Sequence, residues 1–201
     1  GVQTCALPIY KLIGTARYRQ WRLWCVMLTV LCAGFGLPAH ADASRFDGTV
    51  IFIRHALAPG TGDPAIFDLR DCRTQRNLDT TGRKQARAIG RKLAASGVAF
   101  GAIYSSQWCR CLHTAEELKL GKVQALPALN SFFQGRGNST EQTTALKKHL
   151  ATLKPTDKGL YVTHQVNTTA LTGIYPDSGE VVLFKFSPEG EITVLGRVQT
   201  P

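Results

Sequence analysis

The first 41 residues of this 201-residue chain contain no acidic side chain, although four basic residues lie among them. No apolar run reaches the roughly 20 residues that a membrane-spanning helix needs. An apolar run at residues 23–37 follows the basic segment, and an A-x-A pattern ending at Ala41 closes it. This order is typical of a secretory signal peptide. We therefore expect residues 1–41 to be cleaved before Asp42, leaving a periplasmic or secreted chain with no membrane span.

The remaining chain, residues 42–201, lacks internal repeats and low-complexity segments. Its length suits one domain with a sizeable core, and no second domain is predicted.

No pair of arginines precedes the apolar run of the predicted signal peptide, which favours a general secretion route over a twin-arginine one. Residues 1–9 resemble one translated reading frame of a common sequencing adapter, so Cys5 carries no weight in the interpretation.

The mature chain also lacks a dense Lys/Arg run with interleaved aromatic residues, and this argues against nucleic acid as a partner. All 14 acidic residues follow Ala41, but only 20 of the 24 basic residues do, so six positive charges are in excess. An excess of this size suits a phosphorylated or otherwise anionic substrate.

Strand and helix patterns alternate along the mature chain. Residues 49–53 are β-branched or aromatic and nearly all apolar, which is typical of a buried parallel strand. Further strands are expected at residues 102–104, 123–126 and 159–163, and a hairpin at 180–186 and 191–198. Helices are expected at about 82–96, 108–118, between Ser139 or Thr140 and Pro155, and after His164. The pattern predicts an α/β fold, a three-layer α/β/α sandwich whose mostly parallel central sheet ends in an antiparallel C-terminal hairpin.

Residues 57–78 form a long connection rich in Gly and Pro, and loops of this length in compact domains are usually lids or binding loops. Asp79, Thr80 and Thr81 follow it and supply oxygens that cap the first helix. Ser139 or Thr140 is the expected cap of the third helix.

Polar side chains follow three of the predicted parallel strands. Arg54 and His55 end the first strand, Ser105 leads from the second to Arg110, and His164 follows Thr163. Since ligands bind at the carboxyl ends of parallel strands, these groups are expected to converge on one pocket, with His55 facing solvent. Guanidinium groups match paired phosphate oxygens, and two imidazoles can divide nucleophilic attack and charge stabilisation.

The ordered motifs resemble those of the histidine phosphatase superfamily, which has the phosphoglycerate-mutase-like fold. They are Arg54-His55, Leu78 with Gly82 and Gln85-Ala86, Ser105 with Arg110 and Thr114-Ala115, and Thr163-His164. The resemblance implies that His55 is the nucleophile and becomes phosphohistidine. It also implies that Arg54, Arg110 and His164 bind the phosphoryl group, with Arg76 or Asn77 as helpers, and that no cofactor is needed.

The chain departs from the family pattern in two places. Ala56 replaces the glycine of the usual Arg-His-Gly, a mild change if the φ angle there is negative. The acid usually found after the third strand is missing, since residues 129–133 include no Glu. The open alternatives for a general acid are Asp63, Asp68, Asp71 and Glu141. Two function classes follow: a phosphatase that hydrolyses a phosphomonoester, or a catalytically weak phosphoryl-binding protein on the same fold.

Within the superfamily, the chain resembles short secreted members through Asp71-Cys72, Gln75 to Leu78, and Trp108 to Arg110. Some of those relatives are described as phosphatases of lipopolysaccharide core heptose phosphate. The resemblance implies a phosphorylated small molecule or an envelope glycolipid as substrate.

Three cysteines remain after signal cleavage: Cys72, Cys109 and Cys111. Together with His113 they do not form a convincing zinc site, because on a helix positions 109 and 113 share a face while 111 points away. A secreted chain favours one disulfide. In the family pattern, the position of Cys111 is usually held by a small residue packed under the helix. The resemblance therefore implies a buried Cys111 thiol and a Cys72–Cys109 bridge. Three reduced cysteines are the alternative.

Overall fold

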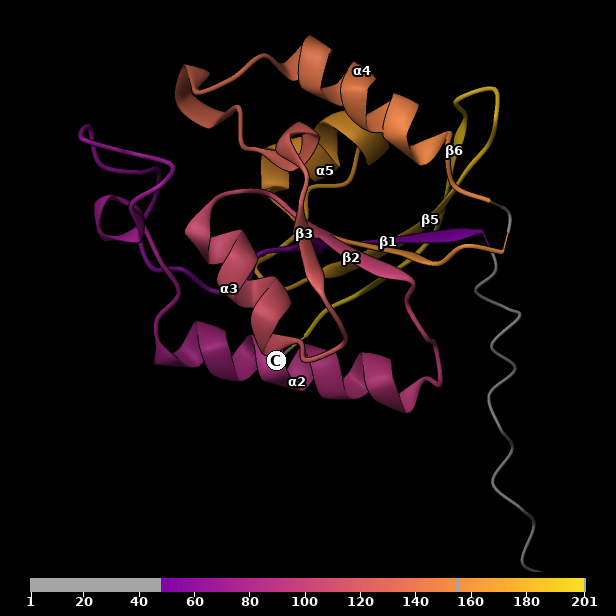
Figure 1. Cartoon of the computed structure of the whole chain (residues 1–201), viewed down its shortest axis with the longest axis horizontal. Helices are drawn as coiled ribbons and strands as arrows, with labels where there is room; N and C mark the ends of the chain where they lie inside the picture. Colours follow the sequence, from indigo (N-terminus) through magenta and orange to yellow (C-terminus); the bar gives the residue numbers. More distant parts are fainter. Residues whose placement is uncertain (1–47, 155, 201) are drawn as a thin grey trace, which may run out of the picture. The chain divides into compact units, whose positions relative to one another are not determined.

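The computed structural model describes residues 48–154 and 156–200; the predicted signal peptide and the adapter-like residues 1–9 lie outside them. The strands are β1 (Thr49–Arg54), β2 (Ala102–Ser105), β3 (Val123–Ala125), β4 (Gly159–Thr163), β5 (Val181–Phe186) and β6 (Ile192–Val198). The helices are α2 (Thr80–Ala95), α3 (Cys109–Glu117), α4 (Ser139–Leu150) and α5 (Gln165–Thr172), with short 3-10 turns η3 (Cys72–Thr74), η4 (Pro127–Leu129) and η5 (Phe133–Gly135). Figure 1 shows their arrangement.

The six strands form one sheet in the order β3-β2-β4-β1-β5-β6. The first four are parallel to one another, whereas β5 pairs antiparallel with β1 and β6 pairs antiparallel with β5. The predicted mostly parallel sheet with an antiparallel C-terminal hairpin is confirmed. In the register of β1 with β4, Arg54 lies opposite Thr163, so the residues that follow, His55 and His164, leave the sheet side by side.

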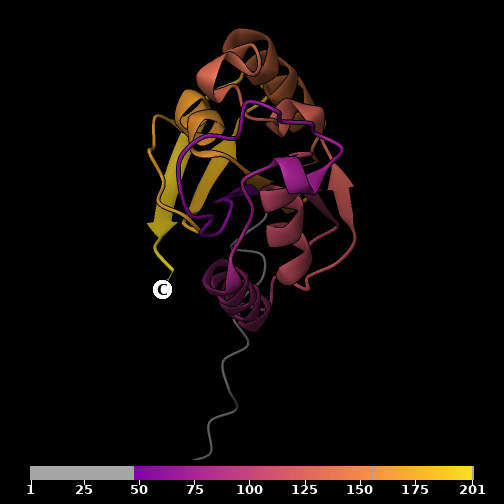
Figure 2. The same cartoon turned by 90° about the vertical axis from the view of Figure 1, so that its left-hand side faces the viewer.

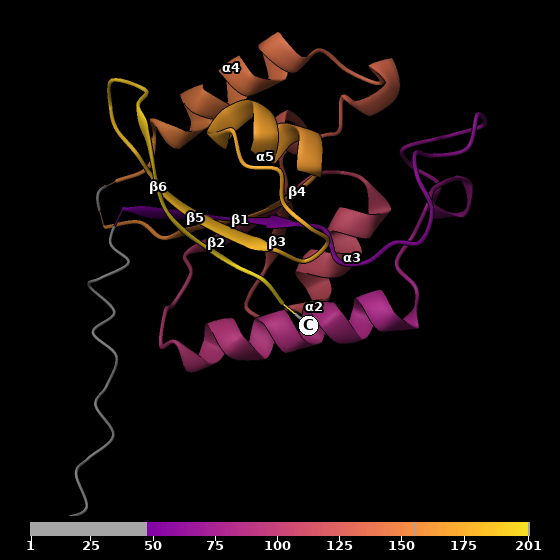
Figure 3. The ribbon, with the colours of Figure 1, turned by 180° about the vertical axis from the view of Figure 1, so that it is seen from behind.

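Helices cover both faces of the sheet, as Figures 1 and 3 show. On one face Ile89 of α2 and Ala115 of α3 pack against Ile51, Ile53 and other buried strand residues. On the opposite face α4 and α5 contribute Leu146, Leu150 and Leu171 to a second cluster with Phe52 and Tyr161. Side chains along the central strands of the sheet therefore point alternately into two apolar layers, and the expected three-layer sandwich is confirmed.

Two helix starts differ from the expected ones. The Asp79 side chain accepts a hydrogen bond from the amide of Gly82, so α2 begins at Thr80, two residues earlier than expected. At α4 the cap is Asn138, whose side chain accepts from the amide of Glu141; the expectation of Ser139 or Thr140 was wrong. Asn is as good a cap as Ser, and three adjacent cap formers leave the choice to geometry.

The long connection between β1 and α2 lies across the carboxyl ends of the parallel strands. Figure 2 shows this segment in front of the sheet edge, with η3 within it. At its far end α2 approaches the chain leaving β1 so closely that a Cβ on Gly82 would lie 1.9 Å from the carbonyl oxygen of Leu57. Only glycine permits that approach, which sets where the connection returns to the sheet.

Candidate active site

A pocket of about 180 Å³ opens at the carboxyl ends of β1 and β4. Five of its lining residues carry a guanidinium or an imidazole: Arg54, His55, Arg76, Arg110 and His164. The remaining lining residues are Gly60, Thr61, Gly62, Ser131, Phe133, Gln165, Val166 and Tyr175. No Asp or Glu lines it among the residues that the structure describes. The four residues expected to act on the phosphoryl group, Arg54, His55, Arg110 and His164, are therefore brought together, and the pocket suits an anion.

His55 is 2% exposed, so the expectation that it faces solvent was wrong. Its backbone amide donates to the carbonyl of Thr163 (2.9 Å), which fixes the turn out of β1. Its Nδ1 lies 2.9 Å from the carbonyl oxygen of Ala56. Because a carbonyl only accepts, Nδ1 carries the proton and Nε2 keeps its lone pair. The ring is thus buried in the floor of the pocket with the correct tautomer for a nucleophile.

His164 is held from both ring nitrogens. Arg110 Nη2 lies 3.3 Å from Nδ1, and the Ser106 hydroxyl lies 2.9 Å from Nε2. A guanidinium only donates, so Nδ1 accepts and Nε2 donates to Ser106, whose hydroxyl in turn donates to Asn130 Oδ1 (3.2 Å). The rings of His55 and His164 lie edge to face, with centroids 5.4 Å apart. This chain of hydrogen bonds fixes the plane of the second imidazole beside the first.

Both imidazoles are neutral at pH 7. Burial lowers the pKa of His55 well below the ordinary 6.5, and the nearby charge of Arg110 lowers it further. The pKa of His164 is lowered for the same two reasons, burial first and Arg110 second. A neutral His55 has the lone pair that attack on phosphorus requires.

Two of the three arginines that line the pocket, Arg54 and Arg110, each have a donor without a partner among the described residues. Arg54 Nη1 donates to the carbonyl of Pro176 (2.9 Å), which anchors one end of its guanidinium. The Nε atoms of Arg54 and Arg110 are buried and have no partner among the described residues. A buried donor without a partner costs about 1–3 kcal/mol. An anion in the pocket would satisfy such donors, as a phosphate site requires.

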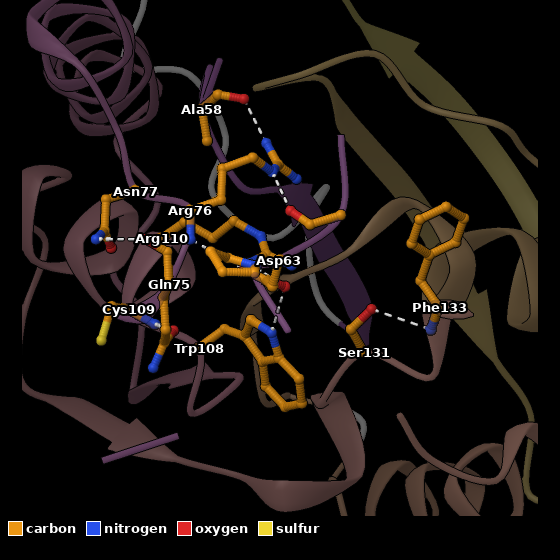
Figure 4. A network of polar contacts seen from close by, with 12 residues as sticks. Ala58, Asp63, Gln75, Arg76, Asn77, Trp108, Cys109, Arg110, Ser131 and Phe133 are labelled. Carbon is orange, nitrogen blue, oxygen red and sulfur yellow. Dashed lines mark hydrogen bonds and ion pairs between the residues drawn. The ribbon is translucent and has the colours of Figure 1, made fainter. Parts of the chain in front are cut away.

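Arg76 and Asn77, the two expected helpers, lie in different places. Arg76 lines the pocket, and its guanidinium donates to the carbonyls of Gly62 (2.8 Å) and Ala58. Asn77 is outside the lining, and its amide donates to the carbonyls of Cys72 (2.5 Å) and Gln75 (3.0 Å). Arg76 therefore adds positive charge to the pocket, whereas Asn77 shapes the turn before α2 (Figure 4).

None of the four candidates for a general acid lines the pocket. Asp68 and Asp71 bind Arg70 and Arg73 beside them in the sequence, and hydrogen bonds from Arg73 lower the pKa of Asp71 to about 2. Glu141 is exposed on the first turn of α4. Asp63 is buried but forms an ion pair with Arg110. The described part of the chain thus places no protonated carboxyl beside His55.

Ala56 fits the position of the usual glycine. The described non-glycine residues with positive φ are Lys119 and Gln134, so φ at Ala56 is negative. Ala56 is fully buried, and its amide donates to the hydroxyl of Thr114 (3.0 Å). The change from glycine leaves the turn that carries His55 intact.

The expected disulfide joins Cys72 to Cys109, with an S–S distance of 2.03 Å. Cys111 is a buried free thiol, as expected, and burial raises its pKa to about 12. With two of the three thiols in a bridge, the zinc alternative loses its ligands. Within residues 48–154 and 156–200 no cluster of three or more His, Cys, Asp or Glu is placed to hold a metal ion. None of the described helices is long and apolar enough to cross a membrane.

Sequence reasoning missed four residues of the site: Ser106, Asn130, Phe133 and Tyr175. Ser106 carried a usable signal, because it follows β2 at the edge where the other polar groups were sought. Asn130 acts from 24 residues further along the chain, across a contact that no local pattern indicates. Phe133 begins the η5 turn and Tyr175 lies in an irregular loop; both line the pocket, and they are 42% and 66% exposed.

The family model described as the histidine phosphatase superfamily (branch 1) matches residues 50–161, more than half of the chain. The chain matches none of the curated proteins. Among solved structures, the protein histidine phosphatase SixA complexed with tungstate is 20% identical, with a TM-score of 0.56 over 75% of this chain and 96% of that one.

Two further solved structures share the fold. Phosphoserine phosphatase from Entamoeba histolytica is 15% identical, with a TM-score of 0.54 over 76% of this chain and 97% of that one. A mycobacterial glucosyl-3-phosphoglycerate phosphatase is 14% identical, with a TM-score of 0.54 over 73% and 96%.

Proposed function

The chain belongs to branch 1 of the histidine phosphatase superfamily, and from this premise we propose that it hydrolyses a phosphomonoester through a phosphohistidine on His55. One observation carries the proposal. His55 Nδ1 donates to Ala56, which leaves Nε2 unprotonated in a cationic pocket shared with Arg54, Arg110 and His164. A nucleophile and its charge stabilisers therefore meet at one place.

In the proposed reaction, Nε2 of His55 attacks phosphorus and forms a phosphorus–nitrogen bond while the bond to the leaving oxygen breaks. The guanidinium groups of Arg54 and Arg110 stabilise the negative charge on the non-bridging oxygens. His164 lies beside them, where its Nδ1 accepts from Arg110 and its Nε2 donates to Ser106. Water then attacks phosphorus, the bond to Nε2 breaks, and inorganic phosphate and neutral His55 are regenerated.

The composition of the pocket restricts the leaving group. No carboxylate lines it within the described residues, so no Asp or Glu is placed to protonate a departing alkoxide. We infer that the substrate has a weakly basic leaving group, such as an anomeric phosphate, a phosphoanhydride or a phosphohistidine. Phe133 and Tyr175 at the mouth of the pocket favour a leaving group with an apolar ring face. A sugar phosphorylated at its anomeric carbon, whether a small molecule or part of an envelope glycolipid, would meet both conditions.

The proposed location is the periplasm or the outside of the cell. The Cys72–Cys109 disulfide supports it, since disulfides persist in oxidising compartments and are rare in the cytosol. The signal-peptide pattern of residues 1–41 supports the same location, because signal peptides direct proteins to secretion.

A non-catalytic phosphoryl-binding protein is the second candidate, and the acid-free pocket is the observation that favours it. A series of phosphate esters with decreasing leaving-group pKa separates the two. The phosphatase should release phosphate faster as the leaving group becomes less basic, and His55→Ala should abolish release. A pure binder would bind phosphate and release none from any ester. The His55→Ala variant must remain folded, as judged by circular dichroism.

A further inference from the structure

Arg110 forms an ion pair through Nη1 with a buried carboxylate, whereas its contact with His164 is through Nη2. Asp63 comes from the long connection between β1 and α2, and its two oxygens lie 2.8 and 3.1 Å from Arg110 Nη1. Both side chains are only 4% exposed. Asp63 does not line the pocket, so it contacts the guanidinium and not the space that a phosphoryl group would occupy.

Both carboxylate oxygens of Asp63 accept hydrogen bonds, and these contacts favour its ionised form. Oδ1 also accepts from the amide of Arg76 (3.0 Å), and Oδ2 accepts from Trp108 Nε1 (3.1 Å) (Figure 4). Burial raises the pKa of Asp63, but the charge of Arg110 and these hydrogen bonds outweigh burial, so the pKa lies below its usual value. A carboxylate held in this way donates no proton to a leaving group.

The ion pair with Asp63 occupies only one nitrogen of the guanidinium, Nη1. Asp63 takes Nη1, whereas Nη2 contacts His164 Nδ1 and Nε is buried without a partner in the described chain. Nε and Nη2 share the same side of a guanidinium, and this side-on edge binds two oxygens of a phosphate in parallel. With Nη1 paired to Asp63, the donors of Arg110 that remain for an anion are Nε and the second hydrogen of Nη2.

Several contacts hold Asp63 in place. Arg136 donates to the carbonyls of Asp63 (3.2 Å) and Pro64 (3.0 Å). The Cys72–Cys109 disulfide and a hydrogen bond from the amide of Cys109 to Gln75 Oε1 (2.9 Å) tie the same connection to the first turn of α3, next to Arg110. Asp63 and Arg110 are thus fixed by one frame.

We propose that Asp63 is a positioning residue: it locks the guanidinium of Arg110 so that the Nε–Nη2 edge meets the transferred phosphoryl group. The inference rests on the proposed phosphatase function. Asp63 acts only through Arg110, and loss of its charge should therefore matter only while Arg110 is present.

A double-mutant cycle tests this. Asp63→Asn should lower kcat/KM by up to about 10²-fold, because a misplaced catalytic group can cost that much. In the Arg110→Ala background the unpaired carboxylate would repel the substrate, so adding Asp63→Asn should leave kcat/KM unchanged or raise it. Asp68→Asn, in the same connection but exposed and paired with Arg70, is the matched control and should stay near wild type.

The opposite pattern overturns the inference. If Asp63→Asn lowers kcat/KM by the same factor with and without Arg110, Asp63 has a general structural role. An Asp63→Asn variant with wild-type kcat/KM overturns it as well. Should Asp63→Asn fail to fold, Asp63→Ser, which can still accept from the amide of Arg76, replaces it in the cycle.

A readout of binding separates this inference from the proposed function. Isothermal titration calorimetry with inorganic phosphate measures binding without turnover. It is applied to the four proteins of the cycle: the wild type, Asp63→Asn, Arg110→Ala and the double variant. Asp63→Asn should weaken phosphate binding in the wild-type background and tighten it in the Arg110→Ala background. That reversal of sign supports the positioning role even if no ester is hydrolysed, and an equal effect in both backgrounds rejects it.

Discussion

At the scale of single residues, the protonation of His55 depends on one hydrogen bond and on burial. The carbonyl of Ala56 takes the proton of Nδ1, and burial removes the water that would stabilise an imidazolium. The His164 imidazole is buried beside it and shares the influence of Arg110. Neither ring is therefore expected to carry a charge at the pH where an exposed histidine is half protonated.

We predict that both rings remain neutral at pH 6.5 in the free protein. Because burial and Arg110 lower the two pKa values, protonation should begin only at more acidic pH. The ring carbon–proton signals of His55 and His164, assigned with His55→Ala and His164→Ala, report this in an NMR titration. The urea-unfolded chain is the control and should titrate near pH 6.5. A folded-state midpoint at or above 6.5 contradicts the assignment of a neutral nucleophile.

The exposed aromatic residues at the pocket mouth should select the leaving group. We predict that Tyr175→Ala and Phe133→Ala each raise KM for 4-nitrophenyl phosphate by about 2- to 10-fold, the effect of losing one aromatic contact. KM for acetyl phosphate, which has no ring, should hardly change. Ile66→Ala is the control, since Ile66 is 78% exposed and lies outside the pocket lining. Equal changes for both substrates would argue against a ring-binding role.

Three of the correctly placed residues lie at strand ends: Arg54 closes β1, and His55 and His164 directly follow β1 and β4. Arg54, His55 and His164 can be located from strand ends alone, because parallel strands bring their carboxyl ends to one edge. The role of Asp63 could not be inferred in this way. It depends on how a long irregular connection folds back onto α3, and the sequence shows only one acidic residue among several in that connection.

At the scale of elements, the connection between β1 and α2 depends on a covalent anchor. Apart from the η3 turn it contains no helix or strand, yet it supplies Arg76 and Asp63 to the site and its surroundings. The Cys72–Cys109 bridge joins it to the first turn of α3. A tie of this kind limits the conformations that the unfolded chain can adopt.

We predict that replacing both bridge cysteines, Cys72→Ser with Cys109→Ser, lowers the free energy of unfolding by about 3–4 kcal/mol. The figure follows from the chain entropy of a loop of this length, since the cysteines are 37 residues apart. Urea unfolding measures it. Reductant should destabilise the wild-type protein by a similar amount and leave the double variant unchanged. If reductant has no effect on the wild type, the bridge does not stabilise this connection.

The elements themselves were largely predictable, and their ends less so. Apolar β-branched runs located the central strands, and the run of Asp79, Thr80 and Thr81 predicted a cap for α2, which Asp79 supplies. At α4, Asn138, Ser139 and Thr140 are all good caps, so composition alone could not choose among them. The short turns η3 and η5 have no periodic pattern, and their form depends on the contacts that they make.

At the scale of the whole molecule, the class of fold followed from the alternation of strands and helices, but the strand order did not. β4 lies between β2 and β1, although α3, β3, two 3-10 turns and α4 separate it from β2 in the sequence. That position sets His164 beside His55 and Arg110. The family pattern implied the same convergence, whereas residue periodicity carries no information about which strands pair.

Three positive charges lie at the carboxyl ends of the parallel strands. Arg54, Arg76 and Arg110 line one pocket, and no acidic residue of the described chain shares the lining. An anionic substrate is therefore attracted to the edge where both imidazoles lie. The account thus makes one central claim, that His55 carries the phosphoryl group between substrate and water.

The most direct test is to trap that intermediate. The protein is mixed with ³²P-labelled acetyl phosphate and quenched within milliseconds in alkali, where the phosphorus–nitrogen bond of phosphohistidine survives; the labelled peptide is then mapped. The account predicts label on the peptide that contains His55, formed before phosphate is released and absent from His55→Ala. Release of phosphate by the wild-type protein without any labelled protein, or equal labelling of His55→Ala, would contradict it.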